Sequence, residues 1–150
     1  MTTINTIHVT CSVCNETSQM VNLTSSNTHG SPDMDARPAP MLRDTLPYQV
    51  QCCPACGYCA DSLAEAPVGA AEFVRSSAYQ QQLRDSALPA LANQFLCRAM
   101  LAAHLGDQAT AGWDALHAAW VCDDVRPKAA PHCRLRAIQW VPGAGRERVA

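Results

Sequence analysis

Residues 53–59 read Cys-Pro-Ala-Cys-Gly-Tyr-Cys, the most informative heptapeptide in the chain. Cys53 and Cys56 are two residues apart, a gap that lets one tight turn present both sulfurs from the same side to a metal ion. Pro54 stiffens this turn, and Gly57 permits a positive φ that lets backbone N–H groups approach the sulfurs. We therefore expect a metal-binding knuckle here.

A second pair, Cys11-Ser12-Val13-Cys14, lies upstream of the first. Two such turns supply four thiolates, which is the full tetrahedral shell of a structural Zn²⁺ site. We therefore predict Zn²⁺ as the cofactor, with Cys11, Cys14, Cys53 and Cys56 as its ligands. Iron also accepts four thiolates, so the spacing does not exclude it. A closed shell leaves no open coordination position, which predicts a structural and not a catalytic ion.

Two further cysteines, Cys52 and Cys59, flank the pair Cys53 and Cys56. Cys56 and Cys59 also have metal-ligand spacing, so a flanking thiol could replace one of the four ligands. The alternation of Tyr48, Val50 and Cys52 instead favours simple burial of Cys52. A third alternative is redox activity, because oxidation of an exposed thiol beside the ion could eject the metal.

The first sixty residues have the pattern of short strands joined by a long loop. Apolar and polar residues alternate in three stretches, residues 7–11, 21–23 and 48–52, which predict about three short antiparallel strands. Thr24–Pro47 contains four prolines and many turn residues, which predicts a long irregular loop. Within it, Asp33, Asp35 and Arg37 are expected to hold one another by hydrogen bonds and fix the loop, or to offer a polar site.

The rest of the chain is rich in alanine and predicts about four helices, over residues 70–84, 89–105, 108–121 and 132–140. Gly106-Asp107 supplies a helix stop followed by an N-cap. We predict an α+β fold in which a zinc ribbon packs on a helical bundle. The predicted parts are the ribbon at 1–62, the bundle at 63–141 and a basic flexible tail at 142–150.

The two central predicted helices are apolar on more than one face. Trp113, Leu116 and Trp120 form a stripe of large residues, and we expect the tryptophans to need a pocket or a partner. Small and aromatic residues flank the Gly106-Asp107 turn at regular intervals: Phe95, Ala99, Ala102, Ala111, Ala115 and Ala118. This spacing resembles one tetratricopeptide repeat, which implies an antiparallel helix pair. An ordinary helix pair in a small bundle is an equally good interpretation.

Three more cysteines, Cys97, Cys122 and Cys133, lie in the helical part near His104, His117 and His132. None of them forms a pair with metal-ligand spacing. Free cysteine is among the most buried residue types, so these three are predicted to be core residues.

Composition narrows the class of protein. The 150 residues suit a single globular domain, and no apolar run approaches the length of a membrane span. We expect a cytoplasmic protein, and a reducing cytoplasm favours metal-bound or redox cysteines over structural disulfides. Nine cysteines is also an odd number, which cannot pair completely. No known catalytic motif is present in the sequence, so we do not expect an enzyme.

Gly-Ser-Pro-Asp-Met-Asp-Ala-Arg-Pro at 30–38 precedes the rubredoxin-type knuckle at 53–59, and the helical segments 92–96 and 119–124 follow it. In these stretches the chain resembles a group of uncharacterised bacterial zinc-ribbon proteins with a domain of unknown function. The resemblance implies a zinc ribbon followed by helices, and it implies no activity.

The combined expectation is a non-enzymatic zinc-binding protein whose helical half binds another protein or a second copy of the chain. Nucleic-acid binding is an alternative, because residues 126–150 carry five Arg and one Lys against one Glu. Residues 1–60 contain no Lys, which counts against a ribbon that contacts phosphates. A redox-responsive or rubredoxin-like iron protein is the other alternative.

Overall fold

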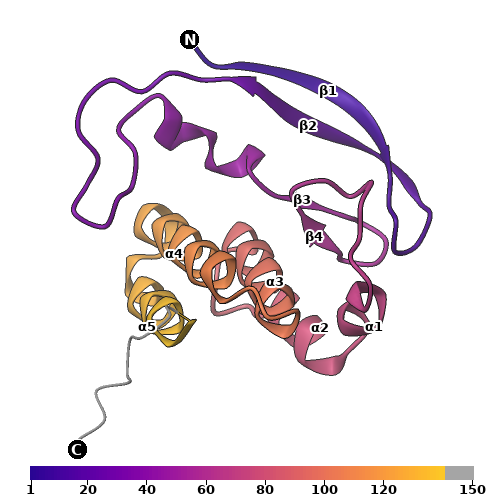
Figure 1. The fold of residues 1–150 in the computed structure, drawn as a ribbon. Helices are drawn as coiled ribbons and strands as arrows, with labels where there is room; N and C mark the ends of the chain where they lie inside the picture. Colours follow the sequence, from indigo (N-terminus) through magenta and orange to yellow (C-terminus); the bar gives the residue numbers. More distant parts are fainter. Residues whose placement is uncertain (141–150) are drawn as a thin grey trace, which may run out of the picture.

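The computed structural model describes residues 1–140, so the predicted tail at 142–150 lies outside the described part. Four strands come first, β1 (Thr3–Thr10), β2 (Thr17–Ser25), β3 (Gln51–Cys52) and β4 (Cys59–Ala60), with a 3-10 helix over Leu42–Tyr48 between β2 and β3. The helices follow: α1 (Ala70–Val74), α2 (Ser77–Leu83), α3 (Ala90–His104), α4 (Gln108–Val125), a short 3-10 helix (Pro127–Ala129) and α5 (Ala130–Trp140). Strands followed by helices confirm the predicted order of the α+β fold (Figure 1).

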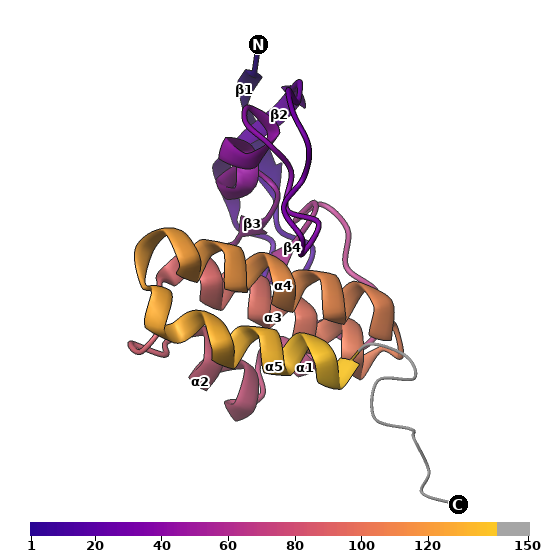
Figure 2. The same ribbon diagram turned by 90° about the vertical axis from the view of Figure 1, so that its left-hand side faces the viewer.

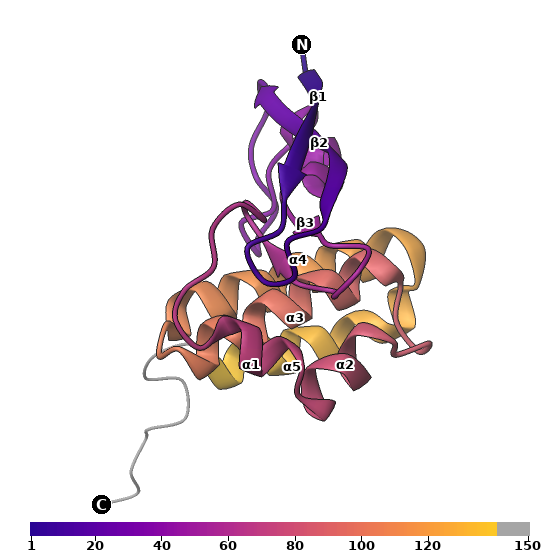
Figure 3. The same ribbon diagram turned by 90° about the vertical axis from the view of Figure 1, so that its right-hand side faces the viewer.

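The strands form two separate antiparallel ribbons within residues 1–140. β1 pairs with β2 as a hairpin that closes at Thr10 and Thr17, and β3 pairs with β4 with Cys52 opposite Cys59. The stretch predicted as a strand at residues 48–52 is a strand only over Gln51–Cys52, because Tyr48 ends the 3-10 helix. The prediction also missed β4, because two residues are too few to show an alternating pattern. The β1–β2 hairpin stands away from the helices, as Figure 3 shows, so much of it is exposed.

The first predicted helix is broken in two, which corrects the prediction of one helix over residues 70–84. The break falls at Arg75 and Ser76. Ser76 takes an extended conformation, and its hydroxyl oxygen accepts a hydrogen bond from the Tyr79 N–H at 3.3 Å. A serine that satisfies a free N–H in this way starts a new helix, and the apolar pattern alone did not reveal it.

The last three helices, α3, α4 and α5, lie side by side and build most of the core (Figure 2). Asp107 caps α4 as predicted, because its carboxylate accepts from the Thr110 N–H at 3.1 Å. Ala111, Ala115 and Ala118 are fully buried, which lets neighbouring helices approach α4 closely. The likeness of α3 and α4 to a tetratricopeptide repeat stays a prediction. In the described part, no helix is both long and apolar enough to span a bilayer.

The long loop before the first 3-10 helix is fixed by the helices and not mainly by its own side chains. Asp35 accepts hydrogen bonds from the Trp120 indole at 2.8 Å and from Arg134 at 2.9 Å. Arg37 is 6% exposed and donates two hydrogen bonds to Asp124, at 2.9 and 2.5 Å. The expectation that Asp33, Asp35 and Arg37 hold one another is met in the backbone, where the Asp33 N–H donates to the Arg37 carbonyl oxygen at 2.8 Å. The side chains of Asp35 and Arg37 instead find their main partners in α4 and α5.

We predict that Asp35→Asn lowers the free energy of unfolding at pH 7 by about 1–2 kcal/mol, because Asp35 accepts charge-assisted hydrogen bonds. Burial raises the pKa of Asp35, but the hydrogen bonds from Arg134 and Trp120 outweigh it and leave the pKa below its ordinary value. A depressed folded-state pKa stabilises the protein above the unfolded pKa of about 4, and this contribution is lost as the pH falls through the folded value. Urea unfolding of the wild type and of Asp35→Asn from pH 7 to pH 4 measures the difference between their free energies of unfolding. This difference should stay constant down to about pH 5. A difference that becomes smaller between pH 7 and pH 5 would contradict a lowered pKa of Asp35 in the folded protein.

Candidate metal centre

All four predicted ligands converge at one place in the fold. The sulfurs of Cys11, Cys14, Cys53 and Cys56 lie within 4.8 Å of one another. The Sγ atoms of Cys11 and Cys56 are 3.7 Å apart, and those of Cys14 and Cys53 are 3.6 Å apart. Four sulfurs at about 2.3 Å from a tetrahedral Zn²⁺ are separated from one another by about 3.8 Å. The chemistry and spacing of these donors therefore suit a metal ion, and the cluster could bind one.

The two turns that carry the cysteines share one backbone frame, although their sequences differ. The Asn15 N–H donates to the Cys11 carbonyl oxygen at 2.8 Å, and the Gly57 N–H donates to that of Cys53 at 2.9 Å. Both Asn15 and Gly57 have a positive φ, of 63° and 84°. This confirms the prediction that Gly57 takes a positive φ, and Asn, which tolerates the left-handed conformation better than most residues, occupies the equivalent position in the other turn. The two knuckles are thus geometric equivalents that face one another.

Backbone N–H groups stabilise the thiolate form of Cys53. Burial of the Cys53 thiol raises its pKa, but backbone hydrogen bonds from Cys56 and Ala55, together with hydrogen bonds from the Cys14 and Cys56 thiols, outweigh the burial and leave the pKa at about 7. A thiolate is the form that binds a metal ion. The knuckle at residues 53–56 is therefore arranged to offer Cys53 as a ligand near neutral pH.

Two side chains of helix α2 form hydrogen bonds with the backbone of the Cys53–Cys56 knuckle and the residues that follow it. The Tyr79 hydroxyl donates to the Gly57 carbonyl oxygen at 2.8 Å and accepts from the Cys59 N–H at 3.0 Å. The Gln80 side-chain amide donates to the Cys56 carbonyl oxygen at 3.2 Å. Tyr79 is fully buried, and burial raises its pKa, so its hydroxyl stays protonated and keeps donating. The helical half thus fixes the position of one predicted ligand, Cys56, and of the neighbouring Gly57 and Cys59.

We predict that Gly57→Ala destabilises the protein by about 2 kcal/mol. An added Cβ would lie 2.4 Å from Leu83 Cδ2 and would also sit at a φ of +84°. Gly106→Ala is a matched control, because Gly106 has a φ of +89° but no atom within 4 Å of an added Cβ. Its cost should be about 1 kcal/mol, from backbone strain alone. Urea unfolding measures both, and equal losses would show that α2 does not press on the knuckle.

The flanking thiols lie outside the four-cysteine cluster. Cys59 is fully buried and Cys52 is half-buried, and they face one another across β3 and β4. The predicted burial of Cys52 is therefore only partial, and neither thiol has replaced a ligand in this arrangement.

The three cysteines of the helical half are fully buried, as predicted: Cys97, Cys122 and Cys133. The histidines that lie near them in sequence do not join them in a metal site in residues 1–140. His104 stacks on Phe73 with ring centroids 4.4 Å apart, and His117 packs against Phe95 and Trp120.

A buried ion-pair network connects the ribbon to the helices, and the sequence analysis missed it. Arg98 of α3 donates two hydrogen bonds to Asp114 of α4, at 2.8 and 2.6 Å. It also donates to the Gln49 carbonyl oxygen at 2.8 Å and pairs with Asp61, on either side of β3 and β4. The sequence did contain a signal for this network, because Arg98 and Asp114 are charged residues on otherwise apolar faces of two predicted helices.

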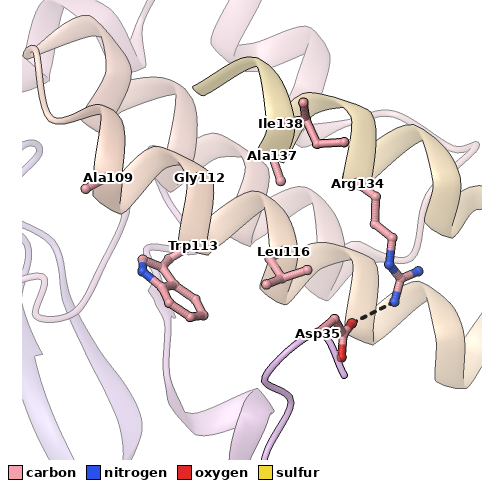
Figure 4. A pocket seen from close by; sticks show the side chains of 8 residues that line it. All are labelled: Asp35, Ala109, Gly112, Trp113, Leu116, Arg134, Ala137 and Ile138. Atoms are coloured by element: carbon pink, nitrogen blue, oxygen red, sulfur yellow. Dashed lines mark hydrogen bonds and ion pairs between the residues drawn. The ribbon is translucent and has the colours of Figure 1, made fainter. Parts of the chain in front are cut away.

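The predicted tryptophan stripe divides into a buried and an exposed residue. Trp120 is 4% exposed and finds its partner within the chain, in Asp35. Trp113 is 51% exposed and lines an apolar groove of about 470 Å³ between α4 and α5 (Figure 4). The prediction was that these tryptophans need a pocket or a partner: Trp120 is accommodated within the chain, and Trp113 lines an open groove.

Comparisons with models of protein families, with curated proteins and with solved structures found no match to this chain. The resemblance to bacterial zinc-ribbon proteins accordingly stays a prediction.

Proposed function

We propose that this chain is a non-enzymatic zinc-binding protein whose ion stabilises the N-terminal ribbon and whose helical half docks a partner protein. The convergence of four cysteine sulfurs, with separations of 3.6 and 3.7 Å, carries the proposal. Two of these cysteines, Cys11 and Cys53, are almost completely buried. Four thiolates fill the tetrahedral shell, so the ion has no position left for a substrate or an activated water.

Metal analysis of protein purified without added metal tests the first half of the proposal. We expect one zinc per chain and X-ray absorption that fits four sulfurs at about 2.3 Å. An iron content near one per chain, with the colour of a ferric tetrathiolate, would instead support the rubredoxin-like alternative. A chain that contains neither metal and binds neither on titration would overturn the metal-binding function.

The groove between α4 and α5 supports the second half of the proposal. Trp113 and Ile138 line it and are about half exposed, at 51% and 54%. In Figure 4 the Trp113 ring and Leu116 lie on the α4 side, while the ion pair of Asp35 and Arg134 lies near one end. An apolar floor with charges at one end suits a protein segment that carries a bulky apolar side chain beside a polar group.

A photo-crosslinking amino acid at position 113 tests this docking surface in cells. We expect one main protein adduct, and the identified protein, once purified, should bind the wild type at least tenfold more tightly than Ile138→Asp. Gln139→Asp is a matched control, because Gln139 is exposed on α5 but does not line the groove. Equal binding by all three proteins would reject the groove, and an adduct with a second copy of the chain would identify self-association.

Residues 1–60 do not favour the nucleic-acid alternative. Their two arginines, Arg37 and Arg43, are both paired with carboxylates, those of Asp124 and Asp33. Such cations are already neutralised and have little left to offer a phosphate backbone. Binding to duplex or single-stranded nucleic acid that weakens steeply with salt would restore this alternative.

A further inference from the structure

Cys52 and Cys59 form a pair of their own next to the metal centre. They are direct partners in the register of β3 and β4. The Cys59 N–H donates to the Tyr79 hydroxyl, while the next backbone pair is joined by Cys53 N–H and the Tyr58 carbonyl oxygen at 2.8 Å. The Cys52–Cys59 position therefore lies between ladder hydrogen bonds, where opposed Cα atoms are about 4.5 Å apart and side chains are closest.

Both thiols point to one acceptor. Cys59 Sγ lies 3.3 Å from the Gly57 carbonyl oxygen, and Cys52 Sγ lies 3.9 Å from the same oxygen. The two sulfurs thus share one face of the ribbon, separate from the cluster of four ligands. A disulfide needs Cα atoms about 4.4–6.8 Å apart with Cβ atoms that face one another, and this arrangement meets both needs.

The two thiols differ in access to solvent. Cys59 is fully buried, whereas Cys52 is half-buried. A small dissolved oxidant can therefore reach Cys52 first, and Cys59 lies beside Cys52 as the thiol that can form a disulfide with it. Redox-sensing cysteines are accessible to solvent and often lie beside a resolving cysteine, and Cys52 and Cys59 have this arrangement.

We propose that Cys52 and Cys59 are a redox-active dithiol, which a peroxide converts to a disulfide while the four metal ligands stay bound to their ion. In the first step the Cys52 sulfur attacks hydrogen peroxide, the O–O bond breaks, and Cys52 sulfenic acid and one water form. In the second step the Cys59 sulfur attacks the Cys52 sulfur and the S–O bond breaks, which releases a second water. The two thiols are oxidised by two electrons, and the peroxide is reduced.

The opposed geometry makes the second step fast, because Cys59 is already in place. A bound ion also protects the neighbouring thiolates, since their electron pairs are donated to the metal. The inference rests on the metal centre only for that protection, so the dithiol and the metal site can be tested separately.

The experiment uses the full chain, loaded with one equivalent of Zn²⁺ and treated with one equivalent of hydrogen peroxide. Thiols that remain free are blocked with N-ethylmaleimide under denaturing conditions. The protein is then reduced, labelled with iodoacetamide and sequenced by tandem mass spectrometry. We expect iodoacetamide on Cys52 and Cys59, maleimide on the four ligands, and zinc content unchanged before denaturation.

Two variants make the result specific. Cys59→Ser should form no disulfide and should instead accumulate a Cys52 sulfenic acid that dimedone traps. Cys122→Ser should react like the wild type. The Cys122 and Cys133 sulfurs lie 3.9 Å apart but are both fully buried, so their oxidation should be at least tenfold slower. Oxidation of the four ligands with release of zinc, while Cys52 and Cys59 stay reduced, would overturn the proposal. So would a disulfide between Cys52 and any other cysteine.

Discussion

Cys53→Ser should reduce the zinc content of the purified protein from about one ion per chain to nearly none. Serine offers a neutral hydroxyl in place of a thiolate, and three thiolates hold the ion far less tightly than four. Four-cysteine sites bind zinc with about 10–16 kcal/mol, which is as large as the whole stability of a typical domain. The strands of the ribbon add little to replace this energy, because β3 and β4 are two residues each and the β1–β2 hairpin is largely exposed.

Limited trypsin digestion measures the consequence for the fold. Arg43 is only partly exposed in the native protein, pairs with Asp33 and donates to the Pro38 carbonyl oxygen, so rapid cleavage after it requires this segment to loosen. We expect rapid cleavage after Arg43 in Cys53→Ser, and in the wild type after treatment with a chelator. Far-ultraviolet circular dichroism should keep most of its helical signal, because α3, α4 and α5 pack mainly on one another.

Cys52→Ser is the matched control, one residue away and outside the cluster. It should retain about one zinc ion and resist trypsin like the wild type. If Cys53→Ser kept its zinc while Cys52→Ser lost it, the assignment of Cys53 as a ligand would be wrong.

The four-cysteine cluster could be predicted from sequence because its geometry is local. Two residues between cysteines fix each knuckle by turn chemistry, and the left-handed residue after each pair follows from steric limits on φ. Only the meeting of the two knuckles is a long-range event, and the tetrahedral requirement of the ion predicts that too. The caps at Asp107 and the ends of α3 are local in the same sense.

The anchors of the long loop could not be predicted, because each joins residues far apart in the chain. Asp35 meets Trp120 and Arg134, and Arg37 meets Asp124, over separations of 85 to 99 residues. Sequence proximity suggested that the charges of this loop pair with one another, since nothing local indicated α4 or α5. The break before α2 was missed for a different reason, because one serine hydroxyl outweighed an apolar pattern that continues across it.

Asp114→Asn should lower the free energy of unfolding by about 3–5 kcal/mol, the second-largest effect that we expect after loss of the ion. The Asp114 side chain is 3% exposed and that of Arg98 is 13% exposed, so the pair is shielded from water. Asparagine keeps the shape of Asp114 but leaves the Arg98 guanidinium buried without its main counter-charge. Asp61 cannot replace that charge, because its side chain is 90% exposed and its charge is screened by solvent.

The melting temperature of the zinc-loaded variant should fall by about 10 °C for a domain of this size. Asp123→Asn is the control, because Asp123 pairs with Arg134 through side chains that are both more than a third exposed. The free energy of unfolding of Asp123→Asn should fall by less than about 1 kcal/mol, as for other surface ion pairs. Zinc content should be unchanged in both variants, which separates this network from the metal centre.

A double variant separates the buried charge from the lost contact. If the penalty comes from an uncompensated guanidinium, Arg98→Met in the Asp114→Asn background should recover more than half of the lost stability, because it removes the stranded charge. If the penalty comes from the hydrogen bonds that join Arg98 to Gln49 and Asp61, the double variant should be less stable than Asp114→Asn alone. Urea unfolding of the four proteins in the cycle distinguishes the two causes. We expect recovery, since those two partners lie toward the solvent side of the network while Asp114 is its buried member.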